Sequence, residues 1–337
     1  MENLKRASLN LDETNSSTGY AALKKGAALV DRSDRKLLRL SGKDPVGMLD
    51  AILTNNLPLG ENVGVYAMLL NSKGRIQTDL RVLKAAGEVL IDTEAEGAEA
   101  AKEILGRYAP FSRIKVEDLS EADTPWSILG LYGPKTKELL GSLDPTEHET
   151  REGEIGGVTL LAAGVTVPAL GYDLIGPAET LATACGHLLR AGAIPANHGA
   201  YETIRIASGI PRFGSDITPE NFPGETGLLE QAVSFEKGCY PGQETVARMH
   251  YRGHPNKQLY RFAIEEPSPT PGEPIVQNGK NIGAITSVAP LHVDERILAL
   301  GYLSRNADPK TPLRAGDNII SVIESPPALM HRGPRDD

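Results

Sequence analysis

The chain has 337 residues, of which 40% are hydrophobic, 23% charged and 5% aromatic, and its formal net charge at pH 7 is −9. This length favours two or three domains over a single core. The acidic balance disfavours direct nucleic-acid binding, because neutralising phosphates requires a basic face. No run of about 18 apolar residues occurs, and the first residues lack the apolar core of a signal peptide. We therefore expect a cytoplasmic protein without a membrane span.

The only two cysteines, Cys185 and Cys239, lie far apart in the sequence. Two thiols provide neither a disulfide framework nor the four ligands of an iron–sulfur cluster within one chain. Cys185 falls in a helical pattern beside Ala184 and Leu188, so we predict that it is a core residue. The 35 glycines and 24 prolines favour many turns and short strands.

The first predicted unit covers residues 20–120 and mixes helices with hairpins, which is typical of an α+β sheet. Asp44 and Pro45 are suited to the N-cap and first turn of a helix that ends near residue 53. The turn at residues 71–74 joins two strands into a β-hairpin. Helices are also predicted at residues 19–29, ending near Gly26, and 94–108, and strands at residues 36–40, 64–70, 75–83, 88–92 and 114–116.

The second predicted unit covers residues 121–256 and ends in a motif around Cys239. Strands are predicted at residues 126–131, 155–163 and 172–175, and helices at residues 134–140 and 177–191. The apolar pattern of residues 201–206 fits a helix or a strand equally. Residues 209–228 form a long loop rich in Gly, Pro, Asp and Asn, and such loops are usually functional or disordered.

From about residue 257 the pattern changes to short strands separated by turns. Strands are predicted at residues 259–264, 274–277, 282–288, 298–302 and 318–323. This spacing predicts a small antiparallel β-barrel of five or six strands over residues 257–325. We expect residues 1–19 and 326–337 to be flexible tails.

Cys239 is predicted to lie on a tight turn between an extended segment at 232–235 and a short helix at 245–249. Gly238 precedes it, Pro241-Gly242 follows, and Lys237 lies two residues upstream. A cation and a helix N-terminus both favour the thiolate form of a cysteine. The alternative is an inert, buried cysteine whose flanking glycines mark only a turn. Local features leave both interpretations open.

The segment after the cysteine is basic in an otherwise acidic chain. Residues 245–264 contain no Asp or Glu but hold Arg248, His250, Arg252, His254, Lys257 and Arg261. The run indicates either a site for an anionic ligand beside the thiol or a solvated linker. His250 and His254 have helical metal-ligand spacing, but Gly253 and Pro255 interrupt the helix and the spacing is irregular for zinc, so we expect no metal.

Within the first hairpin, Thr78 and Asp79 point to opposite faces of their strand, so one of them must face the packed side. A buried carboxylate needs a partner or a function, whereas an edge or solvent-facing position needs neither.

The segment Lys237-Gly238-Cys239-Tyr240-Pro241-Gly242-Gln243-Glu244, followed by Ala247-Arg248, resembles the defining motif of the YgfZ-type folate-binding proteins. These belong to the superfamily of the glycine-cleavage aminomethyltransferases. Residues 209–214 and 64–83 resemble the same family, and the resemblance extends from about residue 20 to 325. It implies two interlocked α+β units and a C-terminal barrel around a central cavity that holds tetrahydrofolate. It further implies support of iron–sulfur cluster assembly or repair, including the clusters of tRNA-modifying enzymes.

Two positions depart from the aminomethyltransferase pattern. Thr78 stands where those enzymes carry the first of two adjacent aspartates. Ala207 stands where they carry a glutamate that binds the pterin ring. Asp79 and Glu202 are the candidate replacements.

The leading hypothesis is a folate-binding factor that acts through Cys239, with Lys237, Gln243 and Arg248 positioning the thiol. The candidate folate residues are Thr78, Asp79, Asp92, Glu202, Arg205 and Tyr240. Expected partners are folate and client iron–sulfur enzymes, and we expect a monomer. Two alternatives remain: a folate-dependent aminomethyltransferase or other one-carbon transferase, and a thiol-based redox or binding protein without folate.

Overall fold

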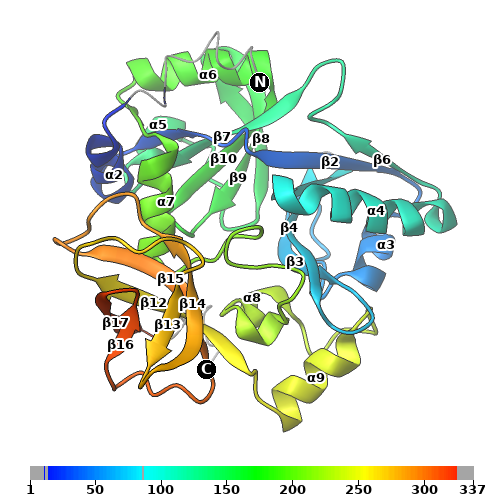
Figure 1. The fold of residues 1–337 in the computed structure, drawn as a ribbon. Helices are drawn as coiled ribbons and strands as arrows, with labels where there is room; N and C mark the ends of the chain where they lie inside the picture. Colours follow the sequence, from blue (N-terminus) through cyan, green and yellow to red (C-terminus); the bar gives the residue numbers. More distant parts are fainter. Residues whose placement is uncertain (1–10, 12–13, 86, 325–337) are drawn as a thin grey trace, which may run out of the picture.

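The structure is a computed structural model that describes residues 11, 14–85 and 87–324. It contains a six-stranded mixed sheet and a five-stranded antiparallel sheet, each with helices, and a closed C-terminal β-barrel (Figure 1). Residues of both sheets line a central cavity. The predicted α+β fold with a barrel and a cavity is therefore confirmed.

One sheet has six strands, and helix α6 (Ala178–Arg190) packs across its β7, β9 and β10 strands. Leu181, Ala184, Cys185 and Leu188 of α6 are buried against this sheet, because they recur at the three- and four-residue spacing of one helix face. Cys185 is therefore a core residue, as predicted. The strands in spatial order are β11 (Ile194–Pro195), β1 (Ala28–Asp31), β7 (Trp126–Tyr132), β10 (Gly171–Pro177), β9 (Val158–Val165) and β8 (Thr150–Ile155).

The other sheet has five strands and is covered by α3 (Pro45–Ile52) and α4 (Ala95–Ser112). The Asp44 carboxylate accepts a hydrogen bond of 2.8 Å from the Gly47 amide, so Asp44 caps α3 as predicted. The strands in spatial order are β3 (Val65–Leu70), β4 (Ile76–Ala85), β5 (Glu88–Glu94), β2 (Arg35–Gly42) and β6 (Ile114–Asp118).

The two units exchange segments, so the predicted boundary at residues 120 and 121 needs correction. Strand β1 belongs to the six-stranded sheet, although the next strand, β2, belongs to the five-stranded sheet. Helix α2 (Ser16–Lys25) packs on α7 (His198–Ala207), from the far end of the second unit. Apolar residues from both sheets also form one cluster. The two sheets bury apolar surface against each other, and the chain crosses between them. A division of the sequence into consecutive units does not predict this exchange of segments.

Residues 209–252 leave the six-stranded sheet and return to the first unit. They contain a 3-10 turn η2 (Pro223–Glu225) and the helices α8 (Leu229–Ala232) and α9 (Gln243–Arg252). Helix α8 packs on β3. Residues 201–206 are helical, within α7. The extended segment predicted at 232–235 is wrong at Ala232, which ends α8, whereas Val233 after it is extended, with φ −130° and ψ 124°.

The barrel closes with α7 packed on β15, so one helix contacts both the second unit and the barrel. Its strands in spatial order are β12 (Lys257–Ile264), β15 (Ile297–Ser304), β14 (Lys280–Val288), β13 (Pro274–Gln277), β16 (Leu313–Ala315) and β17 (Asn318–Glu324).

Most of the two predicted tails lies outside the described residues. Where residues 1–19 are described, Leu11 is buried and residues 16–19 begin α2, which corrects the prediction of a flexible segment there. No helix among the described residues is long and apolar enough to cross a membrane. Helix α5 (Thr136–Leu140) is short and follows β7.

Candidate functional site: a charged cavity and an exposed thiol loop

The central cavity has a volume of about 380 Å³ and lies where both sheets, α7 and α8 meet. The β4 and β5 strands supply Asp79, Arg81, Asp92 and Glu94, whereas β7 and β10 supply Tyr132 and Asp173. Helix α7 contributes Tyr201 and Arg205. Pockets of this size, walled by several elements and holding convergent polar groups, are typical of small-molecule sites.

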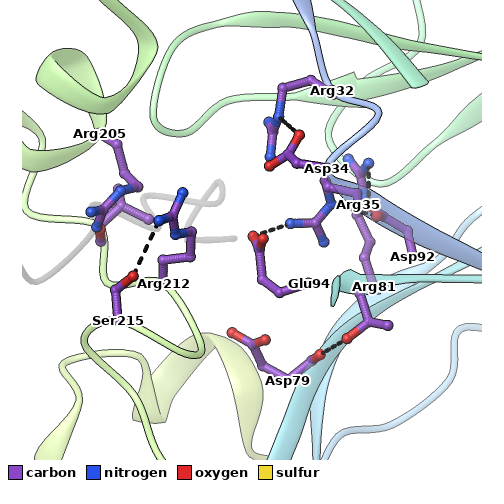
Figure 2. A network of polar contacts seen from close by, with 12 residues as sticks. Arg32, Asp34, Arg35, Asp79, Arg81, Asp92, Glu94, Arg205, Arg212 and Ser215 are labelled. Atoms are coloured by element: carbon purple, nitrogen blue, oxygen red, sulfur yellow. Dashed lines mark hydrogen bonds and ion pairs between the residues drawn. The ribbon is translucent and has the colours of Figure 1, made fainter. Parts of the chain in front are cut away.

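Buried arginines and carboxylates line one wall of the cavity in a continuous network (Figure 2). Arg81 bonds Asp92 at 2.8 Å and also bonds Asp173 of the other sheet. Arg35 bonds Asp92 and Glu94. Burial alone would raise the pKa of Asp92, but Arg35 and Arg81 together hold this pKa below its usual range. The network therefore favours the ionised form of Asp92 and joins the two sheets.

Asp79 is a buried cavity carboxyl that differs from this pattern. The Tyr66 hydroxyl donates a hydrogen bond of 2.6 Å to Asp79 Oδ2, and Asp79 forms no ion pair with any described residue. Burial raises the pKa of Asp79 to about 6, although the Tyr66 hydrogen bond opposes this shift. A carboxyl with this pKa accepts or releases a proton near neutral pH.

Thr78 faces away from the cavity, which corrects its assignment to the folate site. Its side chain is fully buried beneath α4, where its hydroxyl would be 2.0 Å from a Cβ added to Gly97. Its Oγ1 lies 3.0 Å from the Thr93 hydroxyl. The pleat of β4 turns Thr78 toward the helix and Asp79 toward the cavity.

On the opposite side of the cavity, Arg205 and Arg212 project from α7 and the loop after it (Figure 2). Glu202 bonds both arginines, Arg205 at 2.9 Å and Arg212 at 3.2 Å. Burial would raise the pKa of Glu202, but Arg205 and Arg212 lower it. Glu202 thus orients cavity residues and is not itself among the lining residues. Ala207 also lies outside this lining and instead lines a second hollow, beside the barrel.

Several cavity residues are not among those predicted from the sequence: Arg32, Arg35, Asn55, Tyr66, Arg81, Tyr132 and Asp173. A signal for some of them was present, because Asp79 and Arg81 alternate along one face of a strand otherwise rich in apolar residues. Charges in such strands need partners. Which strands supply those partners depends on the way the two sheets pack.

Cys239 lies outside the cavity, on a loop that we define as residues 236–242. Its side chain is exposed, whereas Cys185 is buried and has its pKa raised by burial to about 11. The loop rests on the tip of the β3–β4 hairpin, where Gly242 adopts φ 82° and a Cβ added to it would lie 2.5 Å from the Asn71 carbonyl. Gly242 is also the N-cap of α9, so the helix begins after Cys239 and not at it.

Lys237 does not direct its charge toward the thiol. Its side chain is 1% exposed, and Nζ donates to the carbonyl oxygens of Asp50 at 2.6 Å, Leu53 at 2.8 Å and Asn55 at 3.0 Å. An ammonium has three donors, and these carbonyls occupy all of them. Burial lowers the pKa of Lys237, and Asp50 partly offsets that shift. Lys237 therefore anchors the loop to the end of α3, which corrects its predicted role of activating Cys239.

The remaining motif residues hold the loop in different ways. Tyr240 is buried with Met68, Phe213 and Val246 and does not line the cavity, which corrects its assignment to the folate site. Gln243 begins α9 and its side-chain amide lies 3.5 Å from the Lys237 carbonyl. Arg248 is exposed on α9.

The basic run after the loop does not converge on one site. Arg248, His250, Arg252 and His254 are exposed on or just after α9, whereas Arg261 belongs to β12 and lines the hollow beside the barrel. The His250 ring stacks on Phe235 with centroids 4.1 Å apart. No cluster of three or more metal-binding side chains occurs among residues 14–85 and 87–324.

Comparisons with known proteins agree with this architecture. The family model described as the GCVT N-terminal domain matches residues 13–237. An aminomethyltransferase from Moorella thermoacetica is 27% identical over 320 residues, covering 89% of this chain and 86% of the relative. An aminomethyltransferase from Caldanaerobacter subterraneus is 26% identical over 283 residues, covering 80% of this chain and 74% of the relative.

The crystal structure of the glycine cleavage system aminomethyltransferase T from Bartonella henselae superposes with a TM-score of 0.79 at 21% identity. The match covers 92% of this chain and 88% of that one, so the fold is shared almost throughout. Since the family model matches more than half of the chain, the protein belongs to the family defined by the GCVT N-terminal domain, with an aminomethyltransferase-like fold.

Proposed function

We propose that the protein binds tetrahydrofolate in the central cavity and supports the assembly or repair of iron–sulfur clusters in client enzymes through Cys239. Clients would include enzymes that modify tRNA. The observation that carries this proposal is the separation of two centres: the cavity is lined by buried polar groups, while the thiol is exposed on a loop outside it. An exposed thiol is accessible to another protein while a small molecule stays in the cavity.

The cavity residues suit a reduced folate. A pterin ring presents N–H donors and therefore needs a carboxyl acceptor, and Asp79 is a lining carboxyl that no arginine occupies. Asp92, Glu94 and Asp173 are already bound to arginines. Asp79 would hold the pterin, and Tyr66 would orient the Asp79 carboxyl. Glu202 would act through Arg205 and Arg212 on the opposite wall.

Bound tetrahydrofolate supplies a carrier for one-carbon units. The chain itself contributes Asp79 as a proton donor or acceptor, because its raised pKa allows the carboxyl to be neutral or ionised near physiological pH. The arginine network contributes a fixed, ionised wall that keeps the cavity polar.

The test is complementation in cells that lack the gene, with the activity of a [4Fe–4S] dehydratase normalised to the amount of its polypeptide. The wild-type chain is expected to restore activity, whereas Cys239→Ala is expected to leave activity at the deletion level. Cys185→Ala serves as the matched control and is expected to behave like the wild type. Full restoration by Cys239→Ala would refute the role of the thiol.

A one-carbon transferase is the second candidate, and a specific observation favours it. Thr78 replaces an aspartate of the aminomethyltransferase pattern, but Thr78 faces α4, so the cavity keeps a carboxyl at Asp79. The threonine at position 78 therefore does not deprive the cavity of a carboxyl that a transferase could use. The glycine-cleavage exchange reaction with tetrahydrofolate tests this candidate. Robust turnover that Asp79→Asn abolishes would favour the transferase over a factor that supports iron–sulfur cluster assembly.

A further inference from the structure

Lys237 links the thiol loop to the cavity through a short series of hydrogen bonds. The Tyr66 hydroxyl donates to Asp79 at 2.6 Å inside the cavity. The Asn55 side-chain amide donates to the Tyr66 carbonyl at 3.0 Å, and Lys237 Nζ donates to the Asn55 carbonyl at 3.0 Å. Three hydrogen bonds thus separate the cavity carboxyl from a residue two positions before Cys239.

The segment of residues 54–56 is also fastened to the backbone that leads into the thiol loop. The Thr54 hydroxyl donates to the Ala232 carbonyl at 2.6 Å, and the Ser234 amide donates to the Thr54 carbonyl at 2.9 Å. The Asn55 amide also donates to the Gln231 carbonyl at 2.7 Å. The two segments therefore form one connected unit, although almost 180 residues of sequence separate them.

The same unit forms part of the cavity wall. Asn55, Leu228, Glu230 and Gln231 all line the cavity. A ligand in the cavity therefore contacts the unit on one side, and the exposed Cys239 loop continues from it on the other.

The anchoring of Lys237 is specific enough to transmit a displacement. Two of its carbonyl partners, Asp50 and Leu53, lie at the C-terminal end of α3, where backbone carbonyls lack partners within the helix, and the third, Asn55, follows just after it. Among the described residues, the acceptors of this buried ammonium all belong to residues 50–55, including the Asp50 carboxylate at 3.5 Å. A movement of this segment therefore displaces them together, and the loop must follow or leave a buried charge unsatisfied.

We infer that Lys237 is a positioning residue that couples occupancy of the cavity to the reactivity of Cys239. The inference rests on the proposed function, because tetrahydrofolate is the ligand that it assigns to the cavity. A bound ligand holds residues 54–56 and 231 in place, which restrains the loop and slows reaction at Cys239. By reciprocity, a partner that captures the thiol loop changes the affinity of the cavity for its ligand.

The experiment measures the alkylation rate of Cys239 by iodoacetamide in the full-length chain, with and without saturating tetrahydrofolate, by mass spectrometry of the two cysteine peptides. In the wild type, the ligand is expected to slow alkylation of Cys239 about threefold or more. In Lys237→Met, the ligand is expected to bind, as measured by calorimetry, but to leave the Cys239 rate unchanged. Lys73→Met, an exposed lysine on the neighbouring hairpin tip, is the matched control and should behave like the wild type.

Cys185 in the same samples reports unfolding, because it is buried. If Lys237→Met exposes Cys185, the experiment uses Asn55→Ala in its place. Asn55→Ala removes the hydrogen bond from the Asn55 side chain to the Tyr66 carbonyl and keeps the Asn55 carbonyl that accepts from Lys237. A wild-type rate unaffected by a ligand that binds overturns the coupling. A ligand effect that survives in folded Lys237→Met overturns the role of Lys237, and one that survives in Asn55→Ala overturns the link through Asn55 and Tyr66. Absence of tetrahydrofolate binding to the wild type refutes the proposed function itself.

Discussion

The cavity wall and the thiol loop differ in how their buried charges are compensated. In the wall, arginines and carboxylates from two sheets are buried together and neutralise one another. In the loop, the buried ammonium of Lys237 donates to backbone carbonyls, while Cys239 is exposed, as is Arg248 on the following helix α9. The wall is therefore built for a fixed shape and a small ligand, and the loop for access by another molecule. Asp79 stands apart from both, as a buried carboxyl without a cation.

The largest loss of stability is expected when the wall loses an arginine. Arg81→Met leaves Asp92 and Asp173 without a shared cation, and breaking a buried network of this kind costs about 3–5 kcal/mol of unfolding free energy. Urea denaturation measures the loss. The control is Arg107→Met, which removes an exposed pair with Glu103 and should cost less than about 0.5 kcal/mol. Equal losses for the two variants would show that the wall is not a structural network.

Asp79 and Asp92 are expected to respond to pH with opposite signs. The folded-state pKa of Asp79 is about 6, above its usual 3.8, so ionising this buried carboxyl destabilises the fold as pH rises through that window. Asp79→Asn should therefore raise the unfolding free energy at pH 7.5, on the order of 1–3 kcal/mol, with no gain below about pH 4.

Asp92→Asn is the matched control, because the pKa of Asp92 is lowered. Its ionised form contributes stability above the unfolded pKa, and that contribution is lost as pH falls through the folded one. Asp92→Asn should therefore destabilise the protein at pH 7.5. Denaturation curves between pH 4 and 7.5 measure both variants. A change in unfolding free energy of the same sign for both at pH 7.5 would contradict opposite pKa shifts of the two carboxyls.

Substitutions at two glycines of the thiol loop test whether the loop is held against the β3–β4 hairpin. Gly242→Ala places a Cβ against the Asn71 carbonyl at a left-handed φ, so it should cost roughly 1–3 kcal/mol and loosen the loop. Gly238→Ala meets no atom within 4 Å and should be nearly neutral. Thermal unfolding of the two variants gives the comparison. A neutral Gly242→Ala would mean that the loop is not held against the hairpin.

The smallest expected change in stability comes from the thiol itself. Cys239→Ala should alter the unfolding free energy by less than about 0.5 kcal/mol, because the side chain is exposed. In the wild type, Cys239 should alkylate about tenfold faster than Cys185 at neutral pH, since burial raises the pKa of Cys185 to about 11. Equal alkylation rates would contradict an accessible Cys239.

Local patterns in the sequence predict the elements well where one segment determines the outcome. The cap at Asp44, the β3–β4 hairpin and the barrel strands all follow from turn residues and alternation. The exchange of β1 and α2 between units does not follow from such local patterns, because it depends on which apolar faces meet in space. Lys237 shows the same limit: its spacing from Cys239 suggests activation, yet its partners lie in α3, far away in the sequence.

Calorimetric titration with tetrahydrofolate, performed without oxygen, measures whether the cavity binds the folate independently of Cys239. We predict saturable one-to-one binding to the wild type, the same affinity for Cys239→Ala, and at least about tenfold weaker binding to Asp79→Asn, because Asp79 lines the cavity and Cys239 does not. Absence of binding to the wild type at millimolar ligand would contradict the account. So would a loss of affinity in Cys239→Ala as large as that in Asp79→Asn.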